Sequence, residues 1–361
     1  MSKMVKMKGI ILHGGHGTRL RPLTHTGPKQ LLPIANKPMS QYCIESLREA
    51  GITEIAIIIG GTGADKVKEY YGTGERFGVN LTYIEQDQPR GIAHAINLGK
   101  RFVENNKFIV FLGDNIIQRS ISEFVKDFKQ STAKASILLC VVDNPSRFGI
   151  ADVKEGQIIK IIEKPKNPPS NLAVTGIYFL TPTIFDIIER LKPSWRNELE
   201  ITDALQMLLE ENYEVTYNMI TDYWKDTGTP EDIIHANADV LKNMKPYFNG
   251  KKEDGASVFG NVMIGEGTII KKNSTIIGPV IIGSNCVIDS HTRIGPNTSI
   301  GDNSNLSKCD IEDCIIMSNC VIDADVKIRR SIISMNSNII LMKNNQNEKV
   351  FLLGEGTKIL L

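Results

Sequence analysis

The sequence predicts an α/β fold with a mostly parallel sheet, followed by a parallel β-helix. Two observations lead to this prediction. Apolar runs of strand type alternate with helical stretches up to about residue 240, and beyond it an apolar residue recurs at every sixth position. With 361 residues, of which 41% are hydrophobic, the chain is long enough to form two cores. We therefore expect domains at residues 1–245 and 256–361, joined by a linker at 246–255, with a cap at the C-terminal end.

The predicted strands of the first domain begin as continuous apolar runs, which are typical of a sheet that is buried on both faces. The first run is Lys8–Leu12, and the helix that follows has Met39, Cys43 and Leu47 at helical spacing before Gly51. Repeated strand–helix units predict parallel neighbours with helices on both faces of the sheet. The other elements are strands at 54–60, 80–86, 107–115, 135–144, 157–165 and 172–180, and helices at 64–71, 92–103 and 230–244.

The second domain has a period of six, which matches neither a helix nor an ordinary alternating strand. This period is the signature of a parallel β-helix, in which three six-residue faces form one triangular coil. Each apolar residue then stacks on its counterpart one coil away and fills the prism. The period breaks after Leu306 and resumes at Ile316, so we expect about four residues to bulge out near 309–313, and four to five coils in all. The residues in register are Val258, Ile264, Ile270, Ile276, Ile282, Ile288, Ile294, Ile300 and Leu306.

Composition narrows the class of protein. A net charge of +1 argues against a nucleic-acid-binding surface, which normally has a strong basic excess. No apolar run approaches the roughly 18 residues of a membrane span, and the basic start runs directly into a strand rather than into a secretory signal. Six cysteines in a chain of this length do not indicate a disulfide framework. We expect a cytoplasmic protein with no nucleic-acid or membrane partner.

A glycine loop follows the first predicted strand. Gly14, Gly15 and Gly17 lack a Cβ, so that backbone N–H groups can approach phosphate oxygens. The loop matches neither a P-loop, which needs Lys-Ser or Lys-Thr after the glycines, nor a dinucleotide fingerprint, because Leu20 stands where a third glycine is required. Arg19 adds a permanent positive charge, and Lys29 adds a second one soon after.

Two aspartates are candidates for a metal site. Asp114 ends a predicted strand, and Asp226 lies just before a predicted helix. A lone pair of aspartates is usually structural, as helix caps or solvated turn residues. Beside a basic glycine loop, however, they are suited to hold Mg²⁺ on a nucleotide.

Several segments in this order resemble the glucose-1-phosphate thymidylyltransferases, in their long form with a β-helical tail. The resemblance lies in the segments GGHGTRLRPLT, PKQLLPIANKPM, LGDN, PSNLAVTGIYF, ELEITDAL and WKDTGTPED. It implies a Rossmann-like nucleotidyltransferase domain with a mixed, mostly parallel sheet, followed by a left-handed parallel β-helix. It also implies a homo-oligomer.

The resemblance implies roles for individual residues. Arg19, Lys29 and Lys164 would be catalytic, with Arg19 and Lys29 on the triphosphate and Lys164 on the sugar phosphate. The implied nucleotide-binding residues are Gly14, Gly15, Gly17, Thr18, Gln86 and Gly91. The implied sugar-binding residues are Asp114, Gly149, Glu163, Val174 and Gly176, and the implied metal ligands are Asp114 and Asp226.

The implied reaction is the Mg²⁺-dependent transfer of a nucleotidyl group from dTTP or UTP to glucose 1-phosphate, which yields dTDP-glucose and pyrophosphate in the first case. A phosphate oxygen of the sugar phosphate attacks the α-phosphorus in line with the departing pyrophosphate. A phosphate monoester has a second pKa of about 6, so the nucleophile needs no general base at neutral pH. The obstacle is repulsion between two polyanions, which cations and positioning overcome.

Two residues depart from the family pattern, and three other functions stay open. His13 stands where the family commonly has alanine, which puts base or ribose selectivity in question, and Ser40 stands where an apolar residue is usual. The alternatives are a mannose-1-phosphate guanylyltransferase, a non-catalytic regulatory subunit of the same fold, and a bifunctional enzyme with an acetyltransferase β-helix. For the last of these, His291 is the general base available in the β-helix, although a turn residue is the simpler interpretation.

Overall fold

A computed structural model describes residues 6–15 and 17–341 of the chain. The predicted C-terminal cap, residues 349–361, therefore lies outside the described residues. Contacts between Cα atoms divide the chain into two compact units. The first unit comprises Met1–His16, Thr26–Leu31 and Met39–Asp226. The second comprises Gly17–His25, Leu32–Pro38 and Thr227–Leu361, so that two short segments near the N-terminus belong to the unit that contains the β-helix.

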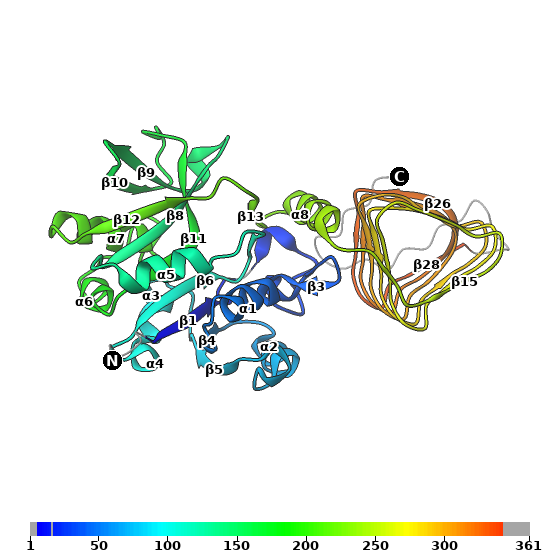
Figure 1. The fold of residues 1–361 in the computed structure, drawn as a ribbon, viewed down its shortest axis with the longest axis horizontal. Coiled ribbons are helices and arrows are strands. Elements are labelled where there is room, and N and C mark those ends of the chain that lie inside the picture. The colour runs from blue at the N-terminus through cyan, green and yellow to red at the C-terminus, as the bar shows by residue number, and fades with distance from the viewer. Residues whose placement is uncertain (1–5, 16, 342–361) are drawn as a thin grey trace. The chain divides into compact units, whose positions relative to one another are not determined.

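The first unit contains a nine-stranded sheet (Figure 1). Seven strands follow the order β10–β9–β11–β6–β1–β4–β5, while β8 pairs with β11 and β12. The pairs β1–β4, β1–β6, β4–β5 and β8–β12 are parallel, whereas β11 is antiparallel to β6, β8 and β9. This mixed α/β sheet confirms the predicted fold class, but the sheet is not mostly parallel: β9 and β10 are also antiparallel, so antiparallel pairs are as many as parallel ones. The strands are β1 Met7–Leu12, β4 Glu54–Ile59, β5 Asn80–Glu85, β6 Lys107–Leu112, β8 Ala135–Val141, β9 Gly149–Lys154, β10 Gln157–Glu163, β11 Leu172–Leu180 and β12 Val215–Met219.

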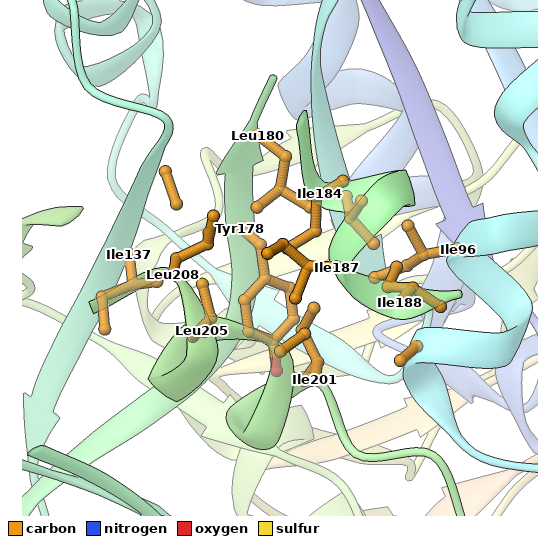
Figure 2. Close-up of a cluster of buried hydrophobic side chains, with 14 of the residues drawn as sticks. Ile96, Ile137, Tyr178, Leu180, Ile184, Ile187, Ile188, Ile201, Leu205 and Leu208 are labelled. Atoms are coloured by element: carbon orange, nitrogen blue, oxygen red, sulfur yellow. The ribbon is translucent and has the colours of Figure 1, made fainter. Parts of the chain in front are cut away.

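Each face of this sheet has its own hydrophobic core. Side chains alternate along β1, so that Ile10 joins one core while Ile11 joins the other. Figure 2 shows part of the first core, where the ring of Tyr178 lies among side chains from α3, α6 and α7. Every residue of β1 is buried, as the continuous apolar run predicts. The helices are α1 Met39–Glu49, α2 Ala64–Tyr71, α3 Ile92–Leu98, α4 Lys100–Val103, α5 Ser122–Gln130, α6 Thr183–Ile188 and α7 Ile201–Glu210.

The second unit contains a parallel β-helix, whose triangular coils are seen nearly end-on in Figure 1. One face is a ladder of six parallel strands in the order β14–β17–β20–β23–β25–β27. This exceeds the four to five coils expected from the sequence. The strands of that face are β14 Tyr247–Phe248, β17 Val262–Ile264, β20 Val280–Ile282, β23 Thr298–Ile300, β25 Ile315–Ile316 and β27 Ile332–Ile333. The other faces are built from β15 Lys251–Lys252, β16 Ser257–Phe259, β18 Ile269–Ile270, β19 Thr275–Ile277, β21 Val287–Ile288, β22 Arg293–Ile294, β24 Asn305–Glu312, β26 Val321–Arg329 and β28 Asn338–Ile340.

Two further elements complete the second unit. Helix α8, Pro230–Asn243, begins at a capping box in which the side chains of Thr229 and Asp232 bond to each other's backbone N–H groups. A short hairpin pairs β2, Pro33–Ile34, with β3, Lys37–Pro38. The stretch predicted as a linker carries β14 and β15, which pair with β17 and β18, so the ladder begins inside it. The domain boundaries themselves stay a prediction.

The expected bulge near residues 309–313 is wrong. Leu306, Ile311 and Ile316 are all buried and pair with Ile288, Ile294 and Ile300 of the preceding coil. The step of ten positions from Leu306 to Ile316 is therefore two steps of five, through Ile311, not one step of six with four extra residues. Lys308 has a φ of 57° at the first of these shortened corners. The period breaks because corners lose a residue, and the interior stays filled.

Within the described ranges, no helix combines the length and the apolar character that crossing a membrane requires.

Candidate active site

In the first unit, the glycine loop lies next to Gln86. The backbone N–H of His13 bonds to the Ile58 carbonyl at 2.9 Å, which continues the β1–β4 pairing to the start of the loop. A Cβ on Gly14 would lie 3.1 Å from Oε1 of Gln86, and the Gly14 carbonyl accepts a bond from Nε2 of Gln30 at 3.1 Å. Nε2 of Gln86 lies 2.9 Å from Nδ1 of His94. Two of the predicted nucleotide-binding positions therefore meet at the carboxyl ends of parallel strands, where ligands bind in open α/β sheets.

The remaining loop residues are divided between the units. Gly15, with a φ of 99°, ends the described part of the loop in the first unit. Gly17, Thr18 and Arg19 belong to the second unit, where Gly17 caps the 3₁₀ helix Thr18–Leu20 with a φ of 57°. The hydroxyl of Thr24 holds the Gly17 carbonyl at 2.8 Å. The triphosphate role of Arg19 stays a prediction.

Gly91 is also predicted to bind the nucleotide. Its position needs a glycine because the backbone of another segment packs closely against it. It precedes α3 with φ 103° and ψ 167°, a region that is almost restricted to glycine. A Cβ there would lie 2.6 Å from the backbone nitrogen of Leu199. Leu199 is held in place by backbone bonds to Arg90 and Ala93, at 2.8 Å and 3.0 Å. The segment that leads into α7 therefore lies directly against this nucleotide-binding candidate.

We expect Gly91→Ala to destabilise the first unit by about 3 kcal/mol, because backbone strain of about 1–3 kcal/mol adds to the contact with Leu199. Gly61→Ala is the matched control. Gly61 also has a positive φ, of 73°, but a Cβ there would meet no atom within 4 Å, so about 1 kcal/mol is expected. Urea unfolding followed by tryptophan fluorescence measures both, since both tryptophans lie in the first unit. Equal losses of stability would contradict the packing role of Gly91.

Asp114 lies in the turn between β6 and the short strand β7, Asn115–Ile117, and is buried. Burial acts to raise the pKa of its carboxyl, but the ammonium of Lys29 and a bond of 3.1 Å from Nδ2 of Asn115 outweigh burial and hold the pKa below its usual value. Lys29 forms an ion pair with this carboxylate, and both side chains are largely buried. Two predicted site residues that are 85 positions apart are therefore in direct contact.

Asp226 lies in the strand β13, Trp224–Asp226, which is antiparallel to β7 and places Asp226 opposite Asn115. Asn115 directly follows Asp114 in the chain, so Asn115 links the two candidate metal ligands, whose metal role stays a prediction. Nε1 of Trp224 donates to Oδ1 of Asn115 at 2.7 Å, and the ring of Phe148 lies 5.7 Å from that of Trp224. A Cβ on Gly176 would lie 2.7 Å from Nδ2 of Asn115, so the predicted sugar-binding Gly176 is in contact with Asn115.

The other predicted sugar-binding residues form one group. Glu163 and Gly149 are paired across β10 and β9. A Cβ on Gly149 would lie 2.5 Å from Cγ2 of Thr202, 3.2 Å from Oε2 of Glu163 and 3.8 Å from Cβ of Val174. Gly149 therefore leaves room for these three side chains to converge. The next residue, Lys164, has a φ of 41°, and its ammonium lies 3.4 Å from Glu163.

Two functional candidates of this group are absent from the prediction. Nη1 of Arg196 lies 3.3 Å from carboxylate oxygens of both Glu163 and Glu200, and the hydroxyl of Thr202 donates to Glu163 at 3.1 Å. Burial raises the pKa of Glu200, and the neighbouring Glu163 adds to that effect. Thr202 lies inside the ELEITDAL segment, which was the available signal, whereas nothing local marks Arg196 as a partner of Glu163.

The side chain of His13 is packed inside the protein rather than exposed in the loop. It is 1% exposed, its ring is 6.3 Å from that of Tyr71, and neither ring nitrogen has a hydrogen-bond partner within the described part of the chain. Burial lowers the pKa of His13 to about 3, although Asp114 acts in the opposite direction, so the ring is neutral at pH 7. The hydroxyl of Ser40, the other unusual residue, bonds to that of Tyr71 at 2.6 Å.

The carboxylates fit a metal that is shared with a substrate. Among the described residues there is no group of three or more histidine, cysteine, aspartate or glutamate side chains that would hold a metal ion alone. The candidate donors are the carboxylates of Asp114 and Asp226, and Asp226 is paired in register with Asn115, the residue that follows Asp114. Mg²⁺ is usually bound by one or two carboxylates together with substrate phosphates and water, so this donor set is suited to it.

Two family models match the sequence. The model described as nucleotidyl transferase matches residues 8–243, and the model described as GMPPB C-terminal domain matches residues 276–359. The first match spans all the candidate site residues described above. The second covers most of the β-helix.

Similar proteins are found over nearly the full length. The chain is 45% identical over 334 residues to the low-salt glycan biosynthesis nucleotidyltransferase Agl11 of Haloferax volcanii, covering 92% of this chain and 94% of that protein. It is 39% identical over 355 residues to a glucose-1-phosphate thymidylyltransferase of Streptomyces antibioticus, covering 98% and 99%. A crystal structure of a Bacillus anthracis protein in complex with sucrose is 42% identical, with a TM-score of 0.63, over 67% of this chain and 98% of that one.

Proposed function

We propose that the chain, which belongs to the nucleotidyl transferase family and is a sugar-1-phosphate nucleotidyltransferase, acts on glucose 1-phosphate. The proposed nucleotide substrate is dTTP, and UTP is also accepted. An oxygen of the sugar phosphate forms a bond to the α-phosphorus, and the bond from that phosphorus to the bridging oxygen breaks. The products are the nucleoside diphosphate sugar and pyrophosphate, which keeps the electron pair of the broken bond. The similarity to the Streptomyces thymidylyltransferase and the quoted segments support this choice of substrates.

One observation carries the proposal: the predicted sugar-binding residues are linked to the two aspartates through neighbouring residues. Gly149, Glu163 and Val174 converge, and Phe148, next to Gly149, packs on Trp224 of the strand that ends at Asp226. Gly176 contacts Asn115, which bonds to Asp114 and is paired in register with Asp226. A sugar held by the first group would therefore place its phosphate toward Asp114 and Asp226. This geometry serves the attack by positioning, which can supply much of the acceleration of a bimolecular step.

Lysines provide the charge that the reaction needs. Lys164 adjoins the sugar-binding group and would neutralise the attacking phosphate, while Lys29 would meet the triphosphate. We propose that Arg19 stabilises the departing pyrophosphate. Asp114 and Asp226 would hold Mg²⁺, which when bound neutralises charge on the phosphates of the nucleotide. Lys29 is paired with Asp114 in this structure, so its ammonium would have to leave this carboxylate to bind the triphosphate.

The side chain of Gln86 is suited to bind a pyrimidine base, which supports dTTP and UTP as the substrates. Because its Nε2 faces His94, its Oε1 is left beside Gly14 as a hydrogen-bond acceptor. The N3–H of thymine or uracil can donate to that oxygen, whereas adenine has an acceptor at the corresponding edge. Adenine would therefore leave a buried acceptor unsatisfied.

Pyrophosphate release across a matrix of nucleoside triphosphates and sugar 1-phosphates tests the proposal. We expect dTTP and UTP with glucose 1-phosphate to be the best pairs. ATP and GTP should be at least roughly tenfold poorer in kcat/KM; for ATP this is the discrimination expected from one unsatisfied buried polar contact. Faster turnover of GTP with mannose 1-phosphate would instead establish a mannose-1-phosphate guanylyltransferase. That second candidate is kept because the C-terminal region matches the GMPPB model.

We propose no second reaction in the β-helix. His291 is exposed and has a φ of 62°, which is the geometry of a corner residue. Mixing the protein with acetyl-CoA and amino-sugar phosphates should release no thiol. Thiol release that is lost in His291→Ala would overturn this part of the proposal.

A further inference from the structure

We propose that the β-helix holds in place the hairpin that follows Lys29 in the chain. Asn36 and Asn237, which make the contacts, would then be positioning residues for nucleotide binding. The inference rests on the proposed function of Lys29 as a triphosphate contact. It concerns the hairpin β2–β3, which begins at Pro33, four positions after Lys29, and lies in the second unit with α8 and the coils.

The hairpin is too small to hold its own shape. It has two residues in each strand, and Pro33 and Pro38, which face each other, have no backbone N–H to donate. An isolated two-stranded hairpin is at best marginally stable even when it is longer. Its turn residues Ala35 and Asn36 have φ values of 48° and 62°, a left-handed pair that is costly for alanine. Contacts from outside the hairpin must therefore keep it in this conformation.

Asn237 of α8 supplies the first of these contacts and joins three elements. Its Oδ1 accepts the backbone N–H of Ala35 at 2.8 Å, and its Nδ2 donates to the carbonyl of Asn297 in the β-helix at 3.0 Å. Asn237 is 0% exposed, and so is Ile34, the residue before Ala35 in the hairpin. The amide of Asn237 thus uses both its acceptor oxygen and its donor nitrogen. Because the site is buried, losing either bond would leave a polar group unsatisfied, which costs free energy of folding.

Asn36 supplies the second contact. Its Nδ2 donates to the carbonyl of Ile300, the last residue of β23, at 2.6 Å. The turn of the hairpin is thus bonded directly to Ile300 of the β-helix. It is also connected, through Asn237, to Asn297 of the same coil. The segment Gly17–His25, which carries Arg19, also belongs to this unit. The β-helix therefore anchors part of the segment that connects the glycine loop to α1.

The test compares Asn36→Gly with a matched control, Asn261→Ala. Glycine keeps the left-handed turn and removes only the donor to Ile300. Asn261 holds the end of α8 through bonds from Nδ2 to the carbonyls of Leu241 and Met244, at 3.3 Å and 2.8 Å, and does not touch the hairpin. We expect Asn36→Gly to raise the KM for dTTP about tenfold, with the KM for glucose 1-phosphate unchanged. Asn261→Ala should lower the melting temperature and leave both KM values unchanged.

Hydrogen exchange of the Ala35 amide gives a readout that does not need activity. It should be at least about tenfold faster in Asn36→Gly and in Asn237→Ala than in the unaltered protein, and unchanged in Asn261→Ala. If neither the exchange rate nor the KM for dTTP responds to Asn36→Gly, or if Asn261→Ala produces the same changes, the inference is wrong. If no nucleoside triphosphate is turned over but exchange responds as expected, the anchoring stands and the proposed function fails.

Discussion

Replacing Asp114 or Asp226 with asparagine is expected to lower kcat by at least about a hundredfold, the scale of losing one preorganised electrostatic contact. Asparagine keeps the size and one oxygen of the side chain but removes the charge that would hold Mg²⁺. Asp114 is kept ionised by Lys29 and Asn115, so its charge is present throughout the neutral range. Steady-state pyrophosphate release at several Mg²⁺ concentrations measures the effect. Higher Mg²⁺ should restore part of the lost rate if binding of the metal is weakened.

Asp222→Asn is the control for both variants. Asp222 lies four positions before Asp226, is 56% exposed, and pairs with Arg119 at 3.8 Å, an exposed pair that contributes little. Its rate should be within about twofold of the unaltered protein, since most exposed pairs are worth less than about 1 kcal/mol. Near-normal rates in both Asp114→Asn and Asp226→Asn would show that these carboxylates do not hold a catalytic metal.

Lys164→Met is expected to reduce kcat/KM for glucose 1-phosphate by about a hundredfold, because a charge-assisted bond to a phosphate is lost in the transition state. Lys164 is a cleaner choice than Lys29, whose removal would also leave the buried carboxylate of Asp114 without its cation. The KM for the nucleoside triphosphate should change little. Lys164→Arg should recover part of the rate, since it keeps the charge but not the shape of the ammonium.

Lys160→Met controls for the loss of a lysine four positions before Lys164, inside the strand that precedes it. Lys160 is exposed on β10 and forms part of the ladder with β9, where Asp152 is its partner in register. We expect its kinetic constants to be unchanged. An equal loss of activity in Lys160→Met and Lys164→Met would mean that the strand, rather than the ammonium of Lys164, is what matters.

Local patterns in the sequence were enough to predict most of the elements. The apolar run of β1 is buried along its whole length, and Ile264, Ile270 and Ile276 fill the interior of the β-helix. Such predictions succeed because each depends on one strand or one coil repeating a simple geometry. The loop glycines and Asp114 were proposed because each ends or follows a predicted strand, and Asp226 because it lies just before a predicted helix.

The contacts among these residues depend on the order and direction of the strands, which no local pattern contains. Antiparallel pairing of β7 with β13 places Asp226 beside Asn115, and the antiparallel pair β9–β10 places Gly149 beside Glu163. The sequence distances within these pairs are large or irregular, so only the folded sheet shows which partners meet. Arg196 was missed for this reason, because its partner Glu163 lies 33 positions away.

The sequence by itself determined the two kinds of architecture and drew attention to the glycine loop and to the acidic and basic residues that we propose for the chemistry, because these depend on residue type and short-range period. Only the tertiary structure decided that the coil shortens at Leu306–Ile316, that His13 is buried, and that the turn at Asn36 is bonded to Ile300. Each of these depends on filling a particular space or satisfying a particular buried polar group. Both are set by atoms that are brought together from distant parts of the chain.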